Sequence, residues 1–309
     1  MKPILSVTLN AAVDKTYTVP GFALDRVHRP TEMRVSAGGK GINVARVYRT
    51  LGGEAEATGF LGGTNGDYLA RALQAEGIPD RCVRVAGESR ICIAILDPLA
   101  GTQTEINENG PQVSPDECDA LLARLRELLP GYEAVVLSGS IPPGVSSGIY
   151  AEIIQMAQAA DVPAILDASG ASLAQGVAAS PFLAKPNVHE LAVLNVGGDG
   201  WGSSAQAVRR KFGVELAIVT GGLRGAVMAS AAGVWEAIPP PVAVVSAVGS
   251  GDSLTAAFLW SYRQHGDLPE ALRVGVAAGA ANAQTSGPGF CTREQILALA
   301  PRVQVNKIG

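Results

Sequence analysis

A glycine-rich segment late in the chain carries the residues best suited to chemistry. It reads Ala247-Val248-Gly249-Ser250-Gly251-Asp252-Ser253 and precedes an expected helix over Leu254–Gln264. Glycines allow tight turns, and N–H groups at a helix start carry partial positive charge, so the segment could bind a phosphate or stabilise a phosphoryl group during transfer. Asp252 would lie beside this anion site, held ionised by the helix end, as a general base. The alternative is an ordinary helix-capping aspartate.

A second glycine-rich segment opens an expected helix near the N-terminus. It reads Ser36-Ala37-Gly38-Gly39-Lys40-Gly41-Ile42-Asn43. Its three glycines allow a backbone to approach a ligand closely, and Lys40 and Asn43 add polar contacts. A glycine loop that merely caps the helix is an equally good interpretation of this segment alone.

A third segment, Lys185-Pro186-Asn187-Val188-His189-Glu190, follows an expected parallel strand. Ligands of open α/β sheets bind beyond the carboxyl ends of such strands. Lys185 could therefore meet a phosphate, while Asn187 and Glu190 could orient Mg²⁺ or its waters. Asn187 with Glu190 three residues later is also typical of a capping box.

Charged residues of the first third could hold a phosphorylated polyol. Asp14 follows the first expected strand, where a carboxylate can accept hydrogen bonds from two sugar hydroxyls, or else belongs to a turn. Arg26, Arg29 and Arg90, with Lys40, could neutralise a phosphate, because arginine binds phosphate through two hydrogen bonds. Each arginine by itself could equally be a solvated surface charge.

Common nucleotide and hydrolase motifs give no competing interpretation. The sequence has neither G-x-G-x-x-G nor G-x-x-x-x-G-K-[ST], so a nicotinamide site and a P-loop lack support. A G-x-S-x-G occurs as Gly144-Val145-Ser146-Ser147-Gly148, but it follows two prolines where a nucleophile elbow would follow a strand. We interpret its serines as helix caps.

The surrounding pattern alternates short apolar strands with amphipathic helices. This pattern predicts parallel strands buried on both faces, and hence a doubly wound, mainly parallel α/β sheet. The expected strands are Ile4–Leu9, Ala57–Leu61, Ala134–Leu137, Ala164–Leu166, Phe182–Ala184 and Leu216–Val219. The expected helices are Ile42–Leu51, Asp67–Glu76, Ser147–Ala160, Val188–Asn195 and Ser203–Phe212.

Two strand-like stretches, neither of which contains an expected helix, interrupt this alternation at about residues 15–35 and 88–107. We expect them to pair into a small β-sheet lid over the site, with extra edge strands of the main sheet as the alternative. Ile91, Ile93 and Ile95 alternate in the second stretch, so the lid would present an apolar face through which two subunits form a homodimer. The whole chain, 1–309, is expected to form one domain.

Composition excludes several other classes of protein. Apolar residues make up 47% and charged residues 17%, enough to bury a large core, and the net charge of −4 argues against a nucleic-acid partner. The four cysteines and three histidines are scattered, which argues against a thiolate or imidazole metal site and favours a reducing compartment. No apolar run is long enough to cross a membrane, so we expect a cytoplasmic protein.

In this order, the motifs resemble those of the ribokinase-like PfkB family of carbohydrate kinases. G-G-K-G-I-N-V-A-R and V-G-S-G-D-S resemble its two signature regions, and T-L-N-A-A-V-D, S-G-S-I-P-P-G, K-P-N-V-H-E and V-T-G-G-L-R-G-A fall where the family has them. Within the family the chain is similar to the hexose-phosphate branch. G-E-S-R-I-C-I-A-I-L, T-Q-T-E-I-N-E-N-G-P and I-L-D-A-S-G-A-S-L look closer to tagatose-6-phosphate kinases, and G-F-C-T-R-E-Q closer to 1-phosphofructokinases.

The resemblance implies a role for each matching residue, with ATP and Mg²⁺ as cofactors. Asp252 would be the base, and Gly249, Ser250 and Gly251 the anion hole. The implied substrate-binding residues are Asp14, Arg29, Gly38, Gly39, Lys40, Asn43, Arg90 and Ser138, with Arg29 and Lys40 toward the sugar's phosphate. The implied nucleotide residues are Lys185, Asn187, Thr220, Gly222 and Gly225, with Asn282 and Gly287 near adenine and Glu190 toward Mg²⁺.

The expected reaction moves the γ-phosphate of ATP onto a primary hydroxyl of a ketohexose phosphate. Tagatose 6-phosphate would react at O1 and fructose 1-phosphate at O6, and the residues do not rank them; fructose 6-phosphate is a further alternative. A sensor that binds sugar phosphate without catalysis is disfavoured by Asp252 and Lys185, which it would not need. The chain departs from the branch at Thr220-Gly221-Gly222, often Ser-Leu-Gly, and at Ala11, usually proline.

Overall fold

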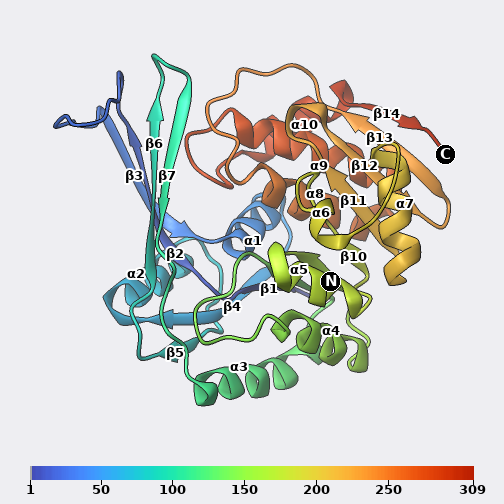
Figure 1. The fold of residues 1–309 in the computed structure, drawn as a ribbon, viewed down its shortest axis with the longest axis horizontal. Coiled ribbons are helices and arrows are strands. Elements are labelled where there is room, and N and C mark those ends of the chain that lie inside the picture. Colours follow the sequence, from blue (N-terminus) through green and yellow to red (C-terminus); the bar gives the residue numbers. More distant parts are fainter. Residues whose placement is uncertain (1) are drawn as a thin grey trace.

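A ten-stranded sheet forms the centre of the computed structural model, which describes residues 2–309 (Figure 1). Its strand order is β14-β13-β12-β11-β10-β9-β8-β1-β4-β5. From β11 to β5 all neighbours run parallel, while β12, β13 and β14 add an antiparallel extension at one edge. The strands are β1 (Ile4–Thr8), β4 (Ala55–Gly62), β5 (Val83–Val85), β8 (Ala134–Ser138), β9 (Ala164–Asp167), β10 (Leu183–Ala184), β11 (Leu216–Thr220), β12 (Ala226–Ser230), β13 (Gly233–Ile238) and β14 (Gln304–Lys307).

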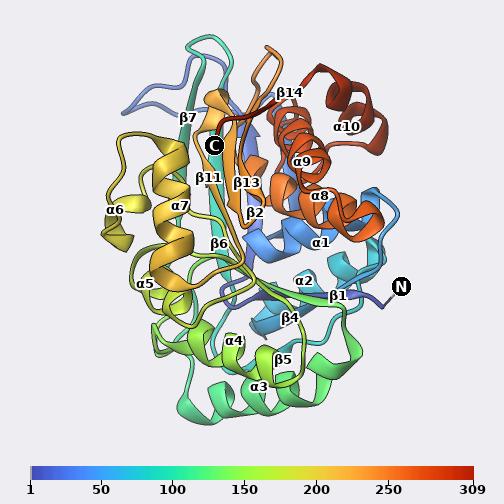
Figure 2. The same ribbon diagram turned by 90° about the vertical axis from the view of Figure 1, so that its right-hand side faces the viewer.

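Helices cover both faces of this sheet, as the alternating pattern predicts. Figure 2 shows α8, α9 and α10 on the opposite side of the sheet from α7. The helices are α1 (Lys40–Thr50), α2 (Gly63–Ala75), α3 (Pro115–Leu128), α4 (Ile149–Ala159), α5 (Gly170–Ala178), α6 (Leu191–Leu194), α7 (Trp201–Phe212), α8 (Ser250–His265), α9 (Leu268–Ala283) and α10 (Arg293–Leu299). Short 3₁₀ turns occupy Leu129–Gly131, Gly222–Arg224 and Ala300–Arg302.

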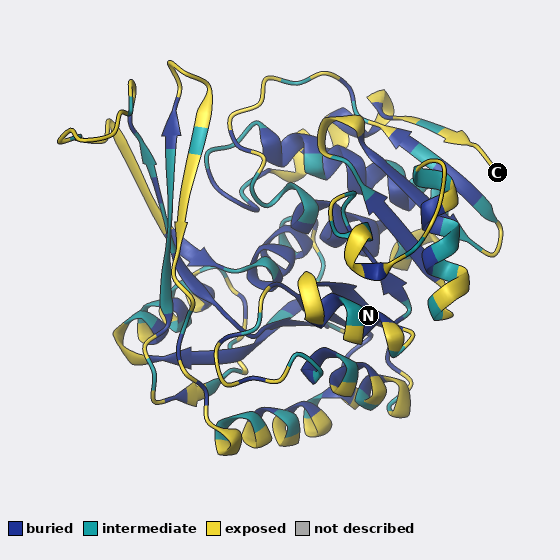
Figure 3. Ribbon diagram, in the orientation of Figure 1, coloured by how far each residue is buried: buried dark blue, intermediate teal, exposed yellow. Residues whose placement is uncertain are grey.

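The core has two main layers because strand side chains alternate between the faces. Ile4 packs into one layer with α1, α2, α8, α9 and α10, and its neighbour Leu5 packs into the other with α3, α4 and α5. The central strands β1, β8, β9 and β10 are buried along their whole length, whereas helices such as α2, α3 and α4 keep exposed outer faces (Figure 3). The doubly wound, mainly parallel α/β fold is therefore confirmed.

A second, four-stranded sheet stands apart from the main one (Figure 1). Its order is β3-β2-β6-β7, with β2 and β6 parallel and the outer pairs antiparallel. We call it the lid sheet; its strands are β2 (Ala12–Thr18), β3 (Glu32–Gly38), β6 (Arg90–Asp97) and β7 (Thr102–Asn107). The alternative of extra edge strands is wrong. The first stretch also reaches further than expected, since β2 begins at Ala12 and β3 ends at Gly38.

Among residues 2–309, no helix is both long and apolar enough to cross a membrane.

Candidate active site

A cleft of about 1240 Å³ lies between the lid sheet and the carboxyl ends of the parallel strands. This is where an open α/β sheet binds ligands. Most of the predicted site residues line it: Asp14, Gly39, Lys40, Asn43, Arg90, Ser138, Lys185, Asn187, Glu190, Thr220, Gly222, Gly225, Gly249, Ser250, Gly251 and Asp252. Segments far apart in the sequence thus converge on one cavity.

The glycine-rich segment predicted to be an anion site leads directly into α8. Gly249 is the N-cap of α8, with φ 82°, which only glycine adopts without strain, and α8 begins at Ser250. The first N–H groups of a helix have no partner within it, and Gly251 and Asp252 both line the cleft. A Cβ on Gly249 would lie 2.6 Å from the Cβ of Pro288, so the loop packs tightly against the chain behind it.

Asp252 lies in the first turn of α8 and is 5% exposed. The amide nitrogen of Asn43 donates a hydrogen bond to its Oδ2 at 2.8 Å. Burial, with the nearby charge of Asp167, raises the pKa of Asp252 to about 6, against the opposing effects of Lys40, Asn43 and Lys185. The pKa therefore lies above the ordinary value for aspartate, because the loss of solvent outweighs the nearby donors and cations.

Asp14 and Arg90 enter the cleft from the lid sheet. The carboxyl group of Asp14 occupies the space that a side chain on Gly38 would fill, so Gly38 acts by making room and does not itself line the cleft. Burial raises the pKa of Asp14 to about 7, although Arg46 and Arg90 oppose the rise. Arg90 donates to the Asn10 carbonyl at 3.1 Å and to the Glu108 carbonyl at 3.0 Å, which fixes its guanidinium at the root of β6.

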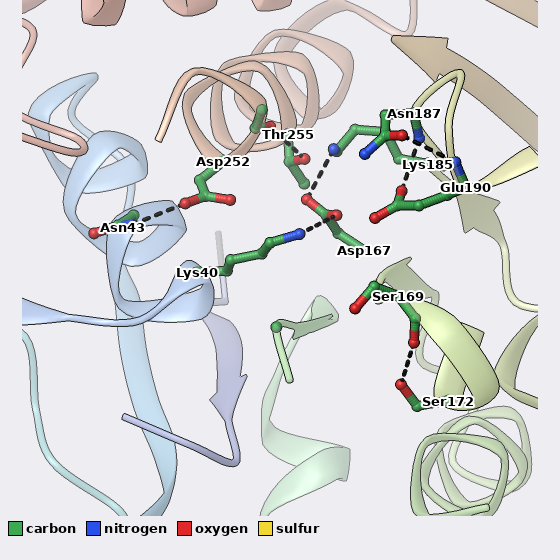
Figure 4. Close-up of polar contacts among 12 residues, drawn as sticks. Lys40, Asn43, Asp167, Ser169, Ser172, Lys185, Asn187, Glu190, Asp252 and Thr255 are labelled. Atoms are coloured by element: carbon green, nitrogen blue, oxygen red, sulfur yellow. Dashed lines mark hydrogen bonds and ion pairs between the residues drawn. The ribbon is translucent and has the colours of Figure 1, made fainter. Parts of the chain in front are cut away.

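Two lysines meet a buried carboxylate that belongs to none of the predicted site residues (Figure 4). Asp167, at the end of β9, pairs with Lys185 at 2.8 Å and with Lys40 at 3.3 Å. Burial alone would raise the pKa of Asp167, but the two ammonium groups outweigh it and hold the pKa below its ordinary value. Asp167 thus keeps both cations beside the anion site. Its only local signal is an aspartate directly after an apolar strand.

Asn187 and Glu190 form the capping interaction that the sequence offered as the alternative. Glu190 Oε2 accepts from the Asn187 N–H at 2.8 Å, while Asn187 Oδ1 accepts from the N–H groups of His189 at 2.9 Å and Glu190 at 3.0 Å (Figure 4). Both lone pairs of the Asn187 oxygen are therefore in use. Glu190 lines the cleft and keeps Oε1 for another partner.

Ser138 and Thr8 offer further polar groups on the cleft wall. Both hydroxyls are buried and have no hydrogen-bond partner within residues 2–309. Because buried polar groups are normally paired, they suit a ligand or bound water. Ser246, also on the cleft wall, donates to Gln103 Oε1 at 2.8 Å, which joins β7 of the lid sheet to the segment before α8.

Besides Gly38, three further predicted site residues do not line the cleft. Arg29 is exposed in the loop between β2 and β3, at the outer end of the lid sheet. Asn282 is fully buried: its amide donates to the Val248 carbonyl at 2.7 Å and accepts from the Gly289 N–H at 2.7 Å, so it holds the anion loop and does not face a base. Gly287 packs against Arg34 and Phe290, while its neighbours Ser286 and Pro288 line the cleft.

An apolar part of the cleft was not predicted. It is lined by small and branched side chains from α9 and from the segment after β13, namely Val276, Ala280, Ala283, Pro240, Val242 and Val244. Such residues also form ordinary cores, so only their convergence on one cavity distinguishes them.

Comparison with known proteins places this site in a family. Residues 7–295 match the pfkB family of carbohydrate kinases. The chain belongs to this family. The 1-phosphofructokinase of Rhodobacter capsulatus is 38% identical over 309 residues, covering 99% of this chain and 98% of that protein. The chain is therefore a sugar-phosphate kinase of the pfkB family.

Solved structures of pfkB kinases share the fold. Phosphofructokinase-2 from Escherichia coli in complex with potassium has a TM-score of 0.89 and 29% identity, covering 98% of this chain and 99% of that one. A possible 1-phosphofructokinase from Thermotoga maritima has a TM-score of 0.90 and 27% identity, covering 99% of each chain. The ribokinase-like resemblance noted in the sequence is confirmed.

Proposed function

We propose that the protein transfers the γ-phosphate of ATP to O6 of fructose 1-phosphate, giving fructose 1,6-bisphosphate. The observation that carries the reaction type is the position of Asp252: a buried carboxylate in the first turn of α8, next to the N–H group of Gly251, hydrogen-bonded to Asn43 and in the cleft that Asp14 also lines. The choice of sugar is supported by the Rhodobacter capsulatus relative, a 1-phosphofructokinase.

We assign the residues of the cleft three roles: positioning the sugar, stabilising charge and transferring the proton. Asp14 and Asn43 orient the sugar, and Arg90 with Ser138 receives its phosphate at the base of the lid sheet. Asp252 takes the proton of the O6 hydroxyl as the oxygen bonds to the γ-phosphorus and the bond to ADP breaks. Lys185, Lys40 and the N–H groups after Gly249 balance the charge on the moving phosphoryl group.

The nucleotide would lie across the other half of the cleft. The apolar part between α9 and the segment after β13 suits a flat base, with Thr220, Gly222 and Gly225 between it and the phosphates. Among residues 2–309, no cluster of three or more His, Cys, Asp or Glu side chains could hold a metal alone. Glu190 with its free Oε1 fits Mg²⁺, which usually takes one or two carboxylates plus phosphates and waters. When bound, Mg²⁺ neutralises charge on the phosphate oxygens.

The substrate is tested with purified enzyme, ATP and three sugar phosphates. We expect kcat/KM for fructose 1-phosphate to exceed that for tagatose 6-phosphate and fructose 6-phosphate by tenfold or more, about the discrimination that one well-placed contact gives. Asp252→Asn enzyme purified in the same way controls for contaminating kinases. A higher kcat/KM for tagatose 6-phosphate would contradict the choice of sugar, and sugar binding without ATP consumption would favour a sensor.

The raised pKa values predict a loss of activity on the acidic side. Asp252, with a pKa of about 6, accepts a proton only when ionised, and Asp14, with a pKa of about 7, binds hydroxyls best when ionised. A raised pKa delays ionisation to higher pH, so kcat/KM should rise between about pH 5 and 8 and then level off. Activity should return when acid-treated enzyme is brought back to pH 8. A kcat/KM that stays flat down to pH 4.5 would show that neither group needs to ionise.

The lid sheet is the surface through which we propose that two subunits form a homodimer. Its side chains Met33, Val35 and Ile106 are exposed apolar groups, and Leu24, Val27 and Leu99 project from its end loops; Ile91, Ile93 and Ile95, expected to be exposed, are half-buried. Arg29 lies in one of these loops, so it could serve a substrate phosphate only in a partner's cleft. A tetrameric, inhibited form is known for the similar Escherichia coli phosphofructokinase-2.

Light scattering at micromolar concentration tests this assembly. We expect a mass twice that of the 31.6 kDa chain, and about 31.6 kDa for Ile106→Glu, because a buried unpaired charge opposes association. Leu297→Glu in α10 is the control, since that leucine is 41% exposed and lies outside the lid sheet. Monomeric wild-type protein, or dimeric Ile106→Glu, would contradict the proposal.

A further inference from the structure

Arg46, in the second turn of α1, is a buried cation that the reaction above does not use. It is 6% exposed, and all five of its N–H donors are occupied. Nε and one terminal nitrogen bind the carboxylate of Glu76 at 2.6 and 2.9 Å. The remaining hydrogens go to the Ala37 carbonyl at 2.6 Å, the Pro288 carbonyl at 3.1 Å and Asn43 Oδ1 at 2.9 Å. Because every donor is engaged, the guanidinium is held in one orientation.

The contact with Asn43 decides which way its amide points. Arginine can only donate, so Asn43 must turn its oxygen toward Arg46 and its NH₂ group toward Asp252. The NH₂ group does donate to Asp252 Oδ2 at 2.8 Å. With the amide reversed, two donors would face each other at Arg46, and two oxygens would face each other at Asp252. Arg46 therefore excludes the wrong orientation.

This fixed amide in turn orients the carboxylate of Asp252. Because Asn43 occupies Oδ2, the other oxygen, Oδ1, is left to accept the hydroxyl proton. The remaining contacts of Arg46 act on neighbouring parts of the cleft. Ala37 is paired with Val13 beside Asp14 in the lid sheet, and Pro288 packs against the Gly249 turn of the anion site. One side chain thus ties the base, the root of the lid sheet and the anion loop together.

We propose that Arg46 is a positioning residue for phosphoryl transfer, acting through the amide of Asn43 on the general base Asp252. This inference rests on the proposed role of Asp252. Glu76 supports it from α2 by holding the outer side of the guanidinium, and the ring of Phe290 lies 4.5 Å from the guanidinium carbon. A purely structural ion pair would need neither the bond to Asn43 nor the approach to the cleft.

A double-mutant cycle tests this route. Arg46→Met keeps the length of the side chain but removes every donor, and we expect kcat to fall about ten- to hundredfold, the cost of a slightly misplaced reacting group, with the KM for ATP unchanged. Asn43→Ala removes the amide. In that background Arg46→Met should lower kcat much less than it does in the wild type, because Arg46 has lost the group through which it acts on Asp252. Effects that multiply fully in the double mutant would overturn the proposal.

Arg263→Met is the matched control for losing an ion pair. Arg263, at the far end of α8, binds the buried Glu133 at 3.1 Å and does not line the cleft. We expect it to lower the melting temperature, as Arg46→Met does, but to leave kcat within twofold of wild type. Wild-type kcat in folded Arg46→Met would overturn the proposal.

Two further variants keep the test decisive. If Arg46→Met does not fold, Arg46→Lys replaces it in the cycle. An ammonium group cannot serve four acceptor groups, so we expect kcat to drop threefold or more. Wild-type kcat in folded Arg46→Lys would also overturn the proposal. Asp252→Asn tests the proposed base independently of Arg46. If Asp252→Asn is inactive while the Arg46 variants have wild-type kcat, only the role of Arg46 is wrong; if Asp252→Asn is fully active, the proposed base is wrong.

Discussion

Asp252→Asn should lower kcat by a hundredfold or more while the enzyme still binds ATP and fructose 1-phosphate. The change keeps the shape of the side chain and an oxygen that can accept from Asn43, but it removes the group that takes the hydroxyl proton. The variant should be at least as stable as wild type at pH 8. Since burial raises the pKa of Asp252 to about 6, its charge opposes folding at any higher pH, and asparagine carries no charge.

Three measurements check this expectation: kcat by coupled assay, ligand affinities by calorimetry, and the melting temperature. Asp267→Asn is the matched control, because Asp267 also begins a helix, accepting from the Glu270 N–H at 3.1 Å, but does not line the cleft. It should leave kcat unchanged. Turnover by Asp252→Asn within a few fold of wild type would mean that another group, or water, receives the proton.

Gly249→Ala should also abolish most activity, by a different route. An alanine at φ 82° is strained by about 1–2 kcal/mol, and its Cβ would lie 2.6 and 2.7 Å from the Cβ and Cα of Pro288. Proline is stiff, and Arg46 holds its carbonyl at 3.1 Å, so the anion loop must move instead. Displaced N–H groups no longer meet the phosphoryl oxygens, and we expect kcat to fall about a hundredfold or more.

Gly266→Ala separates this effect from backbone strain. Gly266 caps the other end of the same helix with φ 67°, and a Cβ there would meet nothing within 4 Å. Both variants therefore carry similar strain, yet only Gly249→Ala disturbs the cleft. We expect comparable losses in melting temperature from strain, and a wild-type kcat for Gly266→Ala. Equal kcat values in the two variants would argue against an anion site at Gly249.

Local patterns predicted the parts of the fold that depend on neighbouring residues. The apolar strands and the glycine-rich helix starts are short-range features, and α1 and α8 begin close to where the glycines place them. The helix expected over Val188–Asn195 is only Leu191–Leu194, because the preceding residues form the Asn187–Glu190 capping turn. The helix Pro115–Leu128 was overlooked, although Ser114 and Glu117 form a capping box that can be recognised in the sequence.

Long-range features could not be predicted in the same way. Asp167 gains its role from lysines of two distant segments, and the pKa of Asp252 depends on how completely the whole fold excludes water from it. Asn282 looks like a ligand-binding residue until its partners in the anion loop are known. Arg29 carries the right charge but lies at the outer end of the lid sheet, a position that only the strand lengths determine.

The hydrogen bond from Ser246 to Gln103 has a consequence for how molecules enter and leave. It joins the lid sheet to the segment before α8, and both residues line the cleft, yet a neutral hydrogen bond stabilises a folded arrangement by only about 0.5–1.5 kcal/mol, at most roughly a tenfold bias. In the absence of ligands this bond can therefore break readily, so that reactants enter and the bisphosphate leaves without a large barrier. A more stable closed state needs free energy from the binding of the reactants, so the lid sheet closes firmly only when both are bound.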